Sequence, residues 1–318
     1  MEILTYTTQQ HWTTWFAVYL FLGGMGAAVV ATSFLTHMYL SEEKELVMWG
    51  AISGVIMMVV GSGMLFLHLL NPWAVFYIVS PYGVFHKPDS WIAWGSQFIV
   101  WIQITAILYA LPYMVEKPRL LNWPIVGPIL KLPIVIQIAN FAKRIHGFLG
   151  WVGIITGIGT AVYTGLLLQS FPAVTLWHNP AVPILFTVSA FSTAMAWLLI
   201  IMYIFIYHRV DHTIRALYER IDLGLITAEL IIIFSFFNFT LSGSESGYRS
   251  ADMLWNDNGW LIGFILFGLI VPLLMELKCV FGTWSGKVPI VTASLLVLNG
   301  GFQLRAFFMA AGIYAYPW

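Results

Sequence analysis

The chain has 318 residues, of which 60% are apolar and 9% are charged, and its 14 basic and 14 acidic side chains leave no net charge. Soluble domains have about 25% charged residues, so this composition excludes a protein that folds in water and indicates one that lies in a lipid bilayer. The lack of a basic surplus argues against nucleic acid as a partner, and the single Cys279 excludes a disulfide framework or an iron–sulfur centre held by this chain alone.

Eight apolar segments are long enough to cross a membrane, because a bilayer core of about 30 Å needs roughly twenty helical residues. They are continuous runs and not the ten-residue alternations of a membrane barrel. The sequence therefore predicts an all-α polytopic membrane protein with eight transmembrane helices. The predicted spans are 13–39, 46–70, 91–115, 146–169, 181–207, 221–242, 260–281 and 288–313.

The distribution of Lys and Arg predicts the orientation of the spans. Eleven of these residues lie in the loops that follow spans 1, 3, 5 and 7, whereas only Lys87 and Arg249 lie in the loops on the opposite side. Basic loops stay in the cytoplasm. We therefore expect both termini and the loops after spans 2, 4 and 6 to face the outer, periplasmic side of the inner (cytoplasmic) membrane.

Two of the outer loops, 71–90 and 243–259, are longer than a hairpin needs and rich in aromatic or polar residues. They fit a docking face for another subunit. They equally fit the belt of Trp and Tyr that forms at the interface of most membrane proteins. The sequence leaves both interpretations open.

A candidate quinone site is predicted where the outer ends of spans 1 to 4 meet. Flat aromatic rings with a few hydrogen-bonding groups suit a quinone, because its two carbonyls need donors. Any single member of this group also fits ordinary interface packing. The group comprises His11, Trp12, Trp15, Tyr19, His68, Asn71, Trp91, Trp94, Gln97, Tyr163 and Thr164.

Two ionisable residues, Glu229 and Arg305, are predicted deep inside spans 6 and 8, where a charge costs roughly 2.5–3.5 kcal/mol. Their depths differ by roughly 13 Å at about 1.5 Å per residue, so direct pairing is not expected. Glu229 fits a proton relay or a protonated carboxyl that bonds a neighbouring helix. Arg305 fits a charge that joins helices through carbonyls or an acid.

Further polar residues in spans 6 to 8 extend this picture. Asn238 and Asn299 could form a ladder with Glu229 and Arg305 if the two helices are adjacent. Glu276 lies near the cytoplasmic end of span 7 and could reach the surface by extending its side chain. The histidines give no pair in the middle of the membrane, although a haem near one surface stays open. No metal-ligand quartet is evident, so no metal site is predicted.

Five segments, in order along the sequence, resemble the NrfD/PsrC family of integral membrane subunits of polysulfide-reductase-type molybdoenzymes. The second, third and fifth are similar to the family passages L-D-L-x-R-P…S-W-x-x-W-G, Y-T-G…W-N-x-P…L-F-x-x-S-A and G-G-x-x-x-R. The segments are YLFLGGMGAA at 19–28, GMLFLHLLNPWAVF at 63–76 with SWIAWGS at 90–96, YTGLLLQSFPAVTLWHNPAVPILFTVSAF at 163–191, AEL at 228–230, and LNGGFQLRAFFMAAG at 298–312.

The resemblance implies two four-helix bundles, here 1–180 and 181–318, with no haem or iron–sulfur cluster of their own. It implies a quinone site near the outer face of the first bundle, with Tyr163 at the family's quinone-associated tyrosine. It also implies partners: a ferredoxin-like iron–sulfur subunit, which contacts a molybdopterin catalytic subunit. Where the family has Asp and Arg at the end of span 2, this protein has His68 and Asn71.

Together these expectations describe a quinol-oxidising membrane subunit of a respiratory oxidoreductase, with a polysulfide, thiosulfate or similar compound as terminal substrate. Menaquinol would bind at Tyr163, His68 and Tyr19, and Glu229 and Arg305 would couple its oxidation to proton movement. Two alternatives stay open. A transporter or channel would have helices broken near mid-membrane, for which Pro272 is the best candidate, and a purely structural anchor would have no quinone site.

Overall fold

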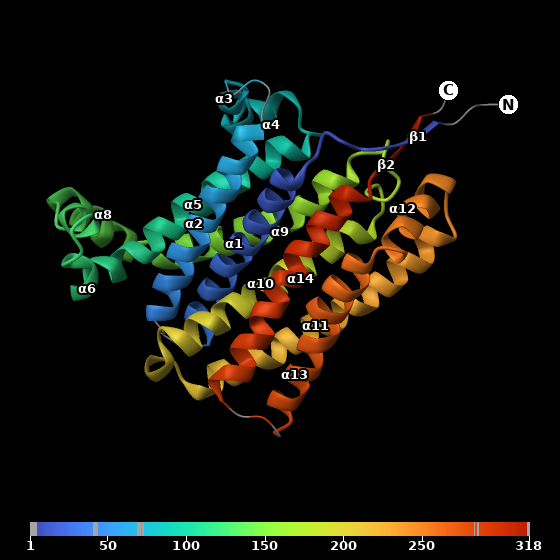
Figure 1. Ribbon diagram of the computed structural model, residues 1–318. Coiled ribbons are helices and arrows are strands. Elements are labelled where there is room, and N and C mark those ends of the chain that lie inside the picture. Colours follow the sequence, from blue (N-terminus) through green and yellow to red (C-terminus); the bar gives the residue numbers. More distant parts are fainter. Residues whose placement is uncertain are drawn as a thin grey trace.

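The computed structural model describes residues 5–40, 44–68, 71, 73–282, 284 and 286–316. Within this part of the chain, eight helical segments are long and apolar enough to cross a membrane, which confirms the predicted all-α polytopic fold (Figure 1). The segments are α1 (Thr14–Tyr39), α2 (Lys44–His68), α5 (Trp91–Val115), α9 (His146–Gln169), α10 (Ala181–Ile204), α11 (His212–Leu241), η2 (Gly259–Ile270) continuing into α13 (Val271–Val280), and α14 (Lys287–Ala310).

The largest difference from the predicted spans is the start of the sixth one. It was expected at residue 221, but α11 begins at His212. The Asp211 side chain accepts a hydrogen bond from the Thr213 backbone N–H at 3.3 Å and caps the first turn. The early turns contain charged residues, so hydropathy alone does not mark them as helix. The predicted end of the second span at 70 lies outside the described residues.

The helices pack in two neighbouring groups. In one, α1 packs against α2 and α9, and α5 packs against α2 and α9; in the other, α10 packs against α11 and α14, and α14 packs against η2 and α13. The groups are in broad contact, because α1 also packs on α10 and α14 and α9 packs on α10. The division of the sequence into bundles at residue 180 stays a prediction.

Small residues allow a very close helix contact between α1 and α2. A Cβ atom on Gly54 would lie 2.6 Å from Val30 Cγ2 and 2.7 Å from the Gly26 carbonyl oxygen. No side chain fits at that distance, so glycine at this position lets the two backbones touch. The Gly50-x-x-x-Gly54 spacing seen in the sequence is therefore a packing device.

The loops between spans form short helices at the two ends of the molecule. Segment 71–90 folds into α3 (Ala74–Val79) and α4 (Tyr82–His86), and segment 243–259 contains α12 (Glu245–Trp255). These three lie at the same end in Figure 1. The opposite end has α6 (Pro118–Leu121), α7 (Val126–Leu130), α8 (Pro133–Arg144) and the short η1 (Tyr207–Arg209).

A two-stranded sheet joins the two ends of the sequence. Strand β1 (Thr5–Thr8) pairs antiparallel with β2 (Ile313–Tyr316), and Val174 of the loop between α9 and α10 bridges to Tyr314. In Figure 1 the sheet lies at the end of the molecule that also contains α3, α4 and α12. The sequence did not predict it, because two four-residue strands give no recognisable periodicity.

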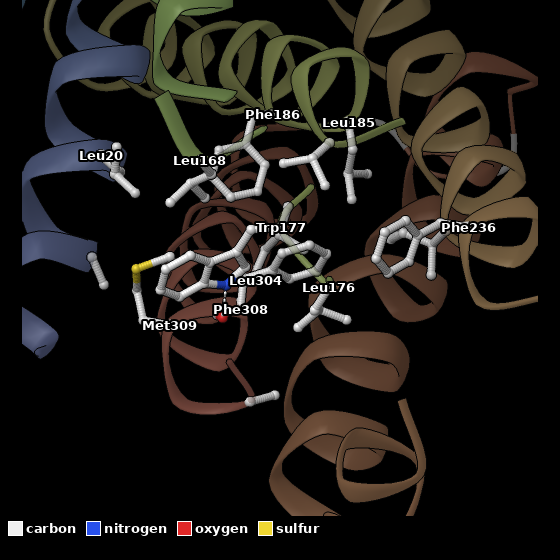
Figure 2. Packing of buried hydrophobic residues seen from close by; sticks show 14 of the residues in the cluster. Leu20, Leu168, Leu176, Trp177, Leu185, Phe186, Phe236, Leu304, Phe308 and Met309 are labelled. Atoms are coloured by element: carbon white, nitrogen blue, oxygen red, sulfur yellow. Dashed lines mark hydrogen bonds between the residues drawn. The ribbon is translucent and has the colours of Figure 1, made fainter. Parts of the chain in front are cut away.

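Below this sheet, Trp177 fills the space where α9, α10 and α14 converge (Figure 2). Its ring is fully buried, and its indole N–H donates a 2.7 Å hydrogen bond to the Phe308 carbonyl. Two residues later, the Asn179 side chain accepts from the Ala181 N–H at 2.9 Å and starts α10. The W-H-N-P segment therefore closes the end of the bundle that holds the candidate site.

Pro272 does not break the seventh span. The backbone stays helical on both sides of it, with wider π-type turns over Gly259–Ile270 and ordinary α turns after Val271. A proline inside a helix removes one N–H and crowds the carbonyl four residues earlier. The wider turns before Pro272 accommodate both effects, so the broken helix that a transporter would have is absent at this position.

Candidate functional site

A cavity of about 260 Å³ lies between α1, α2, α5 and α9, under the short helix α3. Its wall is mainly apolar. The polar groups that reach it come from Tyr19 of α1, Ser62 of α2, Ser96 and Gln103 of α5, and Tyr163 of α9. An apolar pocket with a few convergent polar groups is the usual form of a small-molecule site, and this volume suits one ring system rather than a large cofactor.

Two tyrosines form the polar centre of the cavity. The Tyr19 hydroxyl donates a hydrogen bond to the Tyr163 hydroxyl at 3.1 Å, and both side chains are only 2% exposed. Because Tyr163 accepts this bond, its own O–H proton is left to donate to another acceptor. Tyr163 can therefore hold a carbonyl oxygen inside the cavity, while Tyr19 fixes its orientation.

Gly95 makes room for the ring of Tyr163. A Cβ atom at this position would overlap the Tyr163 ring atoms Cε2, Cζ and Cδ2. A phenol ring cannot bend aside, so any larger residue at Gly95 must displace the whole side chain. The close approach of α5 to α9 at Gly95 thus fixes the position of the donor.

Residues next to Gly95 hold α3 over the cavity. Ser96 Oγ donates to the Ile78 carbonyl at 2.6 Å, and Gln97 Nε2 donates to the Val79 carbonyl at 2.7 Å. These carbonyls belong to the last turn of α3, whose side chains Ile78 and Val79 line the cavity. The helix therefore acts as a cover that is fastened to α5.

The predicted quinone residues occupy several different places. Tyr19 and Tyr163 line the cavity. Trp94 donates from its indole N–H to the Pro88 carbonyl at 2.8 Å, and Thr164 is buried and donates to the Ala161 carbonyl. Neither of these two residues, nor Gln97 or Asn71, is among the residues that line the cavity. Asn71 accepts from the Trp73 N–H at 3.2 Å, and the side chain of His68 lies outside the described residues.

Sequence reasoning missed the contributions of Gln103 and Ser62. Both are polar residues within otherwise apolar helices, and both lie in the wall of the cavity. Gln103 stands twelve residues after the start of α5, which is about 18 Å along the helix. An amide at mid-membrane depth was the available signal. It is a weaker signal than an ionisable residue, because a neutral amide or hydroxyl costs less to bury than a charge.

Arg305 is completely buried and joins α14 to α10. Its guanidinium donates to Ser189 Oγ at 2.5 Å, to the Gly301 carbonyl at 2.8 Å and to the Phe186 carbonyl at 3.0 Å. The same group lies 5.0 Å from the centre of the Phe186 ring. These contacts match the expectation of a charge that holds helices together through carbonyls.

Glu229 of α11 lies on the other side of Ser189. It is 3% exposed, it contacts the Ser189 hydroxyl, and it interacts electrostatically with Arg305. The acid and the base therefore meet through a serine of α10, which is consistent with the expectation that they do not pair directly. The predicted ladder with Asn238 and Asn299 does not form, because both asparagines are exposed on the outside of their helices.

The acids of α11 form a longer buried stripe than expected. Arg215, Glu219, Asp222 and Glu229 are all buried, and they follow one another at helical spacing on one face. Glu276 of α13 is 4% exposed, so the expectation that it extends to the surface is wrong. The signal for this stripe was the spacing of the charges, which was lost when the helix was predicted to begin at 221.

No group of three or more His, Cys, Asp or Glu side chains with metal-binding geometry occurs in the described part of the chain. His37 and His146, expected at helix ends on the cytoplasmic side, lie 5.5 Å apart between ring centres. His37 Nδ1 shares a 2.8 Å hydrogen bond with the hydroxyl of the buried Tyr109. This cluster lies at the opposite end of the first four spans from Tyr163.

Comparison with known proteins gives the family. A family model described as "Polysulphide reductase, NrfD" matches residues 4–317, nearly the whole chain. The protein belongs to this family. Similar proteins include "Protein NrfD" of Escherichia coli (strain K12), which is 25% identical over 312 residues, covering 95% of this chain and 94% of that protein.

Two further NrfD-family relatives have the same extent. "Protein NrfD homolog" of Haemophilus influenzae is 24% identical over 310 residues, covering 95% of this chain and 94% of its own length. The C subunit of the polysulfide reductase of Wolinella succinogenes is 23% identical over 320 residues, covering 96% and 95%. The likeness therefore extends across all eight spans.

The segments that resemble the NrfD family in sequence meet at two places in the structure. The W-G of one segment and the Y-T-G of another bring Gly95 and Tyr163 together at the cavity. The F-x-x-S-A and G-G-x-x-x-R segments bring Phe186, Ser189 and Arg305 together in the other group of helices. Segments far apart in the sequence thus form two compact sites.

Proposed function

We propose that this protein is the membrane subunit of a reductase complex and that it passes electrons between menaquinol and an iron–sulfur partner subunit. The family and the name of the Wolinella relative, a subunit of polysulfide reductase, support the coarser part of this proposal. The observation that supports quinol binding most directly is the Tyr19–Tyr163 pair inside an apolar cavity.

The residues of the cavity fit a quinol ring. The apolar wall suits the ring and its lipid tail, and the Tyr163 O–H can donate to a ring oxygen. A bound quinol supplies two electrons and two protons. In this protein Tyr163 orients the ring, Tyr19 orients Tyr163, and α3 keeps the cavity closed to water.

Glu229 and Arg305 are proposed to couple this reaction to proton movement. Glu229 Oε1 is buried without a hydrogen-bond partner, so this carboxyl can take up a proton at little structural cost. Arg305 stays fixed by its three hydrogen bonds and stabilises the ionised form of Glu229. In this proposal Glu229 holds the moving proton and Arg305 is a positioning residue.

The end of the molecule with α3, α4, α12 and the β1–β2 sheet is proposed as the outer, periplasmic face. A ferredoxin-like iron–sulfur subunit would dock there, within electron-transfer reach of the cavity, and would contact a molybdopterin catalytic subunit. Polysulfide, thiosulfate or a similar compound would be the terminal substrate. The two four-helix bundles, 1–180 and 181–318, would then hold the quinol and the proton route respectively.

The Tyr163→Phe variant tests the quinol site. It removes one hydroxyl and little volume, so we expect a loss of about 0.5–1.5 kcal/mol, or roughly twofold to tenfold in quinol affinity or turnover. The measurement is quinol-dependent electron transfer by the purified complex. Reduction of the partner's clusters by an artificial donor should be unchanged, because it bypasses the cavity.

Tyr109→Phe is the matched control for this experiment. Tyr109 is also fully buried and also loses a hydroxyl hydrogen bond, to His37, but it lies outside the cavity. It should keep wild-type quinol-dependent activity. A fall of both activities together in Tyr163→Phe, or no fall in either, would show that Tyr163 is not at the quinol.

The orientation has a separate test. A protease site or tag added after the C-terminus should be cut or labelled from outside in cells whose outer membrane is permeabilised, because eleven of the Lys and Arg residues lie in the loops on the other side. A tag inserted between α7 and α8 should be protected under the same conditions. Cytoplasmic access at the C-terminus would reverse the proposed docking face.

A further inference from the structure

Three buried carboxyl groups in the second group of helices form no ion pair in the described part of the molecule. Asp222, Glu229 and Glu276 are 0%, 3% and 4% exposed. The ion pairs found among the described residues involve only the acids Glu45, Glu116 and Glu245, all of which are at helix ends or in loops. Three carboxylates cannot stay ionised together in this setting without compensation.

Asp222 and Glu276 lie within hydrogen-bonding reach of each other, across the contact between α11 and α13. Ser192 Oγ donates to Asp222 Oδ1 at 2.8 Å. The remaining oxygens, Asp222 Oδ2 and both oxygens of Glu276, have no other hydrogen-bond partner. One proton placed between the two carboxyl groups would satisfy these oxygens and remove one of the two charges.

A pocket of about 300 Å³ connects this pair to the end of the molecule opposite α3 and α4. It lies between the end of α10, the start of α11 and the end of α13, and Tyr203, Glu219 and Cys279 are among its walls. Glu219 is one turn before Asp222 on α11, and it interacts electrostatically with Glu276. The pocket therefore leads to the carboxyl pair through one further acid.

The basic residue closest to this route is already occupied. Arg215 donates to the carbonyls of Tyr207 and Val210 and stacks on the Tyr207 ring at 4.3 Å. Glu219 itself accepts a 2.6 Å hydrogen bond from the Tyr203 hydroxyl. The polar and titratable groups that face the pair from the surrounding elements are Ser192 and Tyr203 of α10, Arg215, Glu219 and Glu229 of α11, and Cys279 of α13.

We propose that Asp222 and Glu276 share one proton and form a proton-loading site that is filled from this pocket. The proton comes from water in the pocket through Glu219, and only O–H bonds form and break. Its onward acceptor is Glu229, two turns further along α11. This inference rests on the proposed function for the use of the proton, but the existence of the shared proton does not depend on quinol chemistry.

Infrared spectroscopy of the purified complex tests the shared proton directly. A protonated carboxyl has a C=O stretching band that shifts in D₂O, and we expect Glu276→Gln to remove one such band at neutral pH. The double variant Asp222→Asn/Glu276→Gln should remove no more than the single one, because the pair holds one proton. Glu245→Gln, on exposed α12, is the matched control and should leave the band unchanged.

Two outcomes would overturn the proposal. One is an unchanged carboxyl band in Glu276→Gln, and the other is loss of the wild-type band in sodium but not in potassium buffer, which would make the pair a sodium site. If Glu276→Gln assembles poorly, Ser192→Ala replaces it. That variant removes the hydroxyl that donates to Asp222, so it should shift the frequency of the band, and an unshifted band would again contradict the pair.

Vesicles containing the whole complex separate this inference from the proposed function. With quinol as donor, Glu276→Gln should take up fewer protons per quinol from the side of the pocket than the Glu245→Gln control. Wild-type proton uptake in Glu276→Gln would take the pair off the route. A wild-type complex that does not oxidise quinol but keeps the carboxyl band would contradict the proposed function and leave the pair intact.

Discussion

The Gly95→Val variant is expected to lose quinol-dependent electron transfer on the order of 10²-fold while the complex still assembles. The valine side chain would occupy the space of the Tyr163 ring, which a Cβ atom alone already overlaps. Tyr163 must then rotate away from Tyr19 and out of the cavity. A misplacement of about 1 Å at a reacting group can cost this much in rate, and here the whole donor is displaced.

A glycine without close neighbours provides the control. Gly63 lies in a transmembrane helix, like Gly95, but a Cβ atom there meets nothing within 4 Å. Gly63→Val should therefore keep wild-type turnover with quinol and with an artificial donor. If Gly95→Val retains quinol-dependent turnover, either the ring has another position that functions equally well or the cavity is not the quinol site.

The Arg305→Gln variant is expected to show the largest loss of stability, about 3–5 kcal/mol, which is typical of removing one partner from a buried charged network. The substitution leaves the Phe186 carbonyl and the Ser189 hydroxyl without their donor, and it leaves Glu229 without a nearby positive charge. Arg305→Lys should lie between wild type and Arg305→Gln, because Lys keeps the charge but not the planar fork of donors. The measurement is unfolding of the purified protein in detergent.

A double-mutant cycle identifies the source of this loss. If Glu229 and Arg305 are coupled across Ser189, Glu229→Gln should recover part of the stability lost in Arg305→Gln, because no uncompensated acid then remains. Arg249→Gln removes an exposed i,i+4 pair with Glu245 and should change stability by about 0.5 kcal/mol or less. Strictly additive losses in the double variant would show that Glu229 and Arg305 act independently.

Most of the fold could be predicted from the sequence, because each span is an apolar run of the length that a bilayer requires. Trp91–Val115 and His146–Gln169 were predicted with the same limits as the structure has. The start of α11 was missed because a helix that extends beyond the bilayer has charged turns. Hydropathy measures transfer into lipid, whereas the Asp211 cap and the i,i+4 spacing of Arg215 and Glu219 determine helix formation.

The candidate site was harder to predict, because it depends on which side chains point inward. Tyr19 and Tyr163 were placed together by depth and by resemblance, and the structure shows them hydrogen-bonded. Their role with quinol stays a prediction. Trp94 and Gln97 have the right depth, yet they bond the backbone near α3. Depth can be read from a sequence, but the rotation of a helix about its axis depends on its neighbours.

The β1–β2 sheet makes the first transmembrane helix the last to be completed. Gln9, which precedes α1, donates through its side chain to the Met309 carbonyl, 300 residues further along the sequence, and its N–H donates to the Gly312 carbonyl. The ribosome must therefore finish the eighth span before the start of the first can reach its final position. A nascent polypeptide keeps one end of α1 open until synthesis is nearly over, and a protein truncated before Ile313 would expose that unpaired end to membrane proteases.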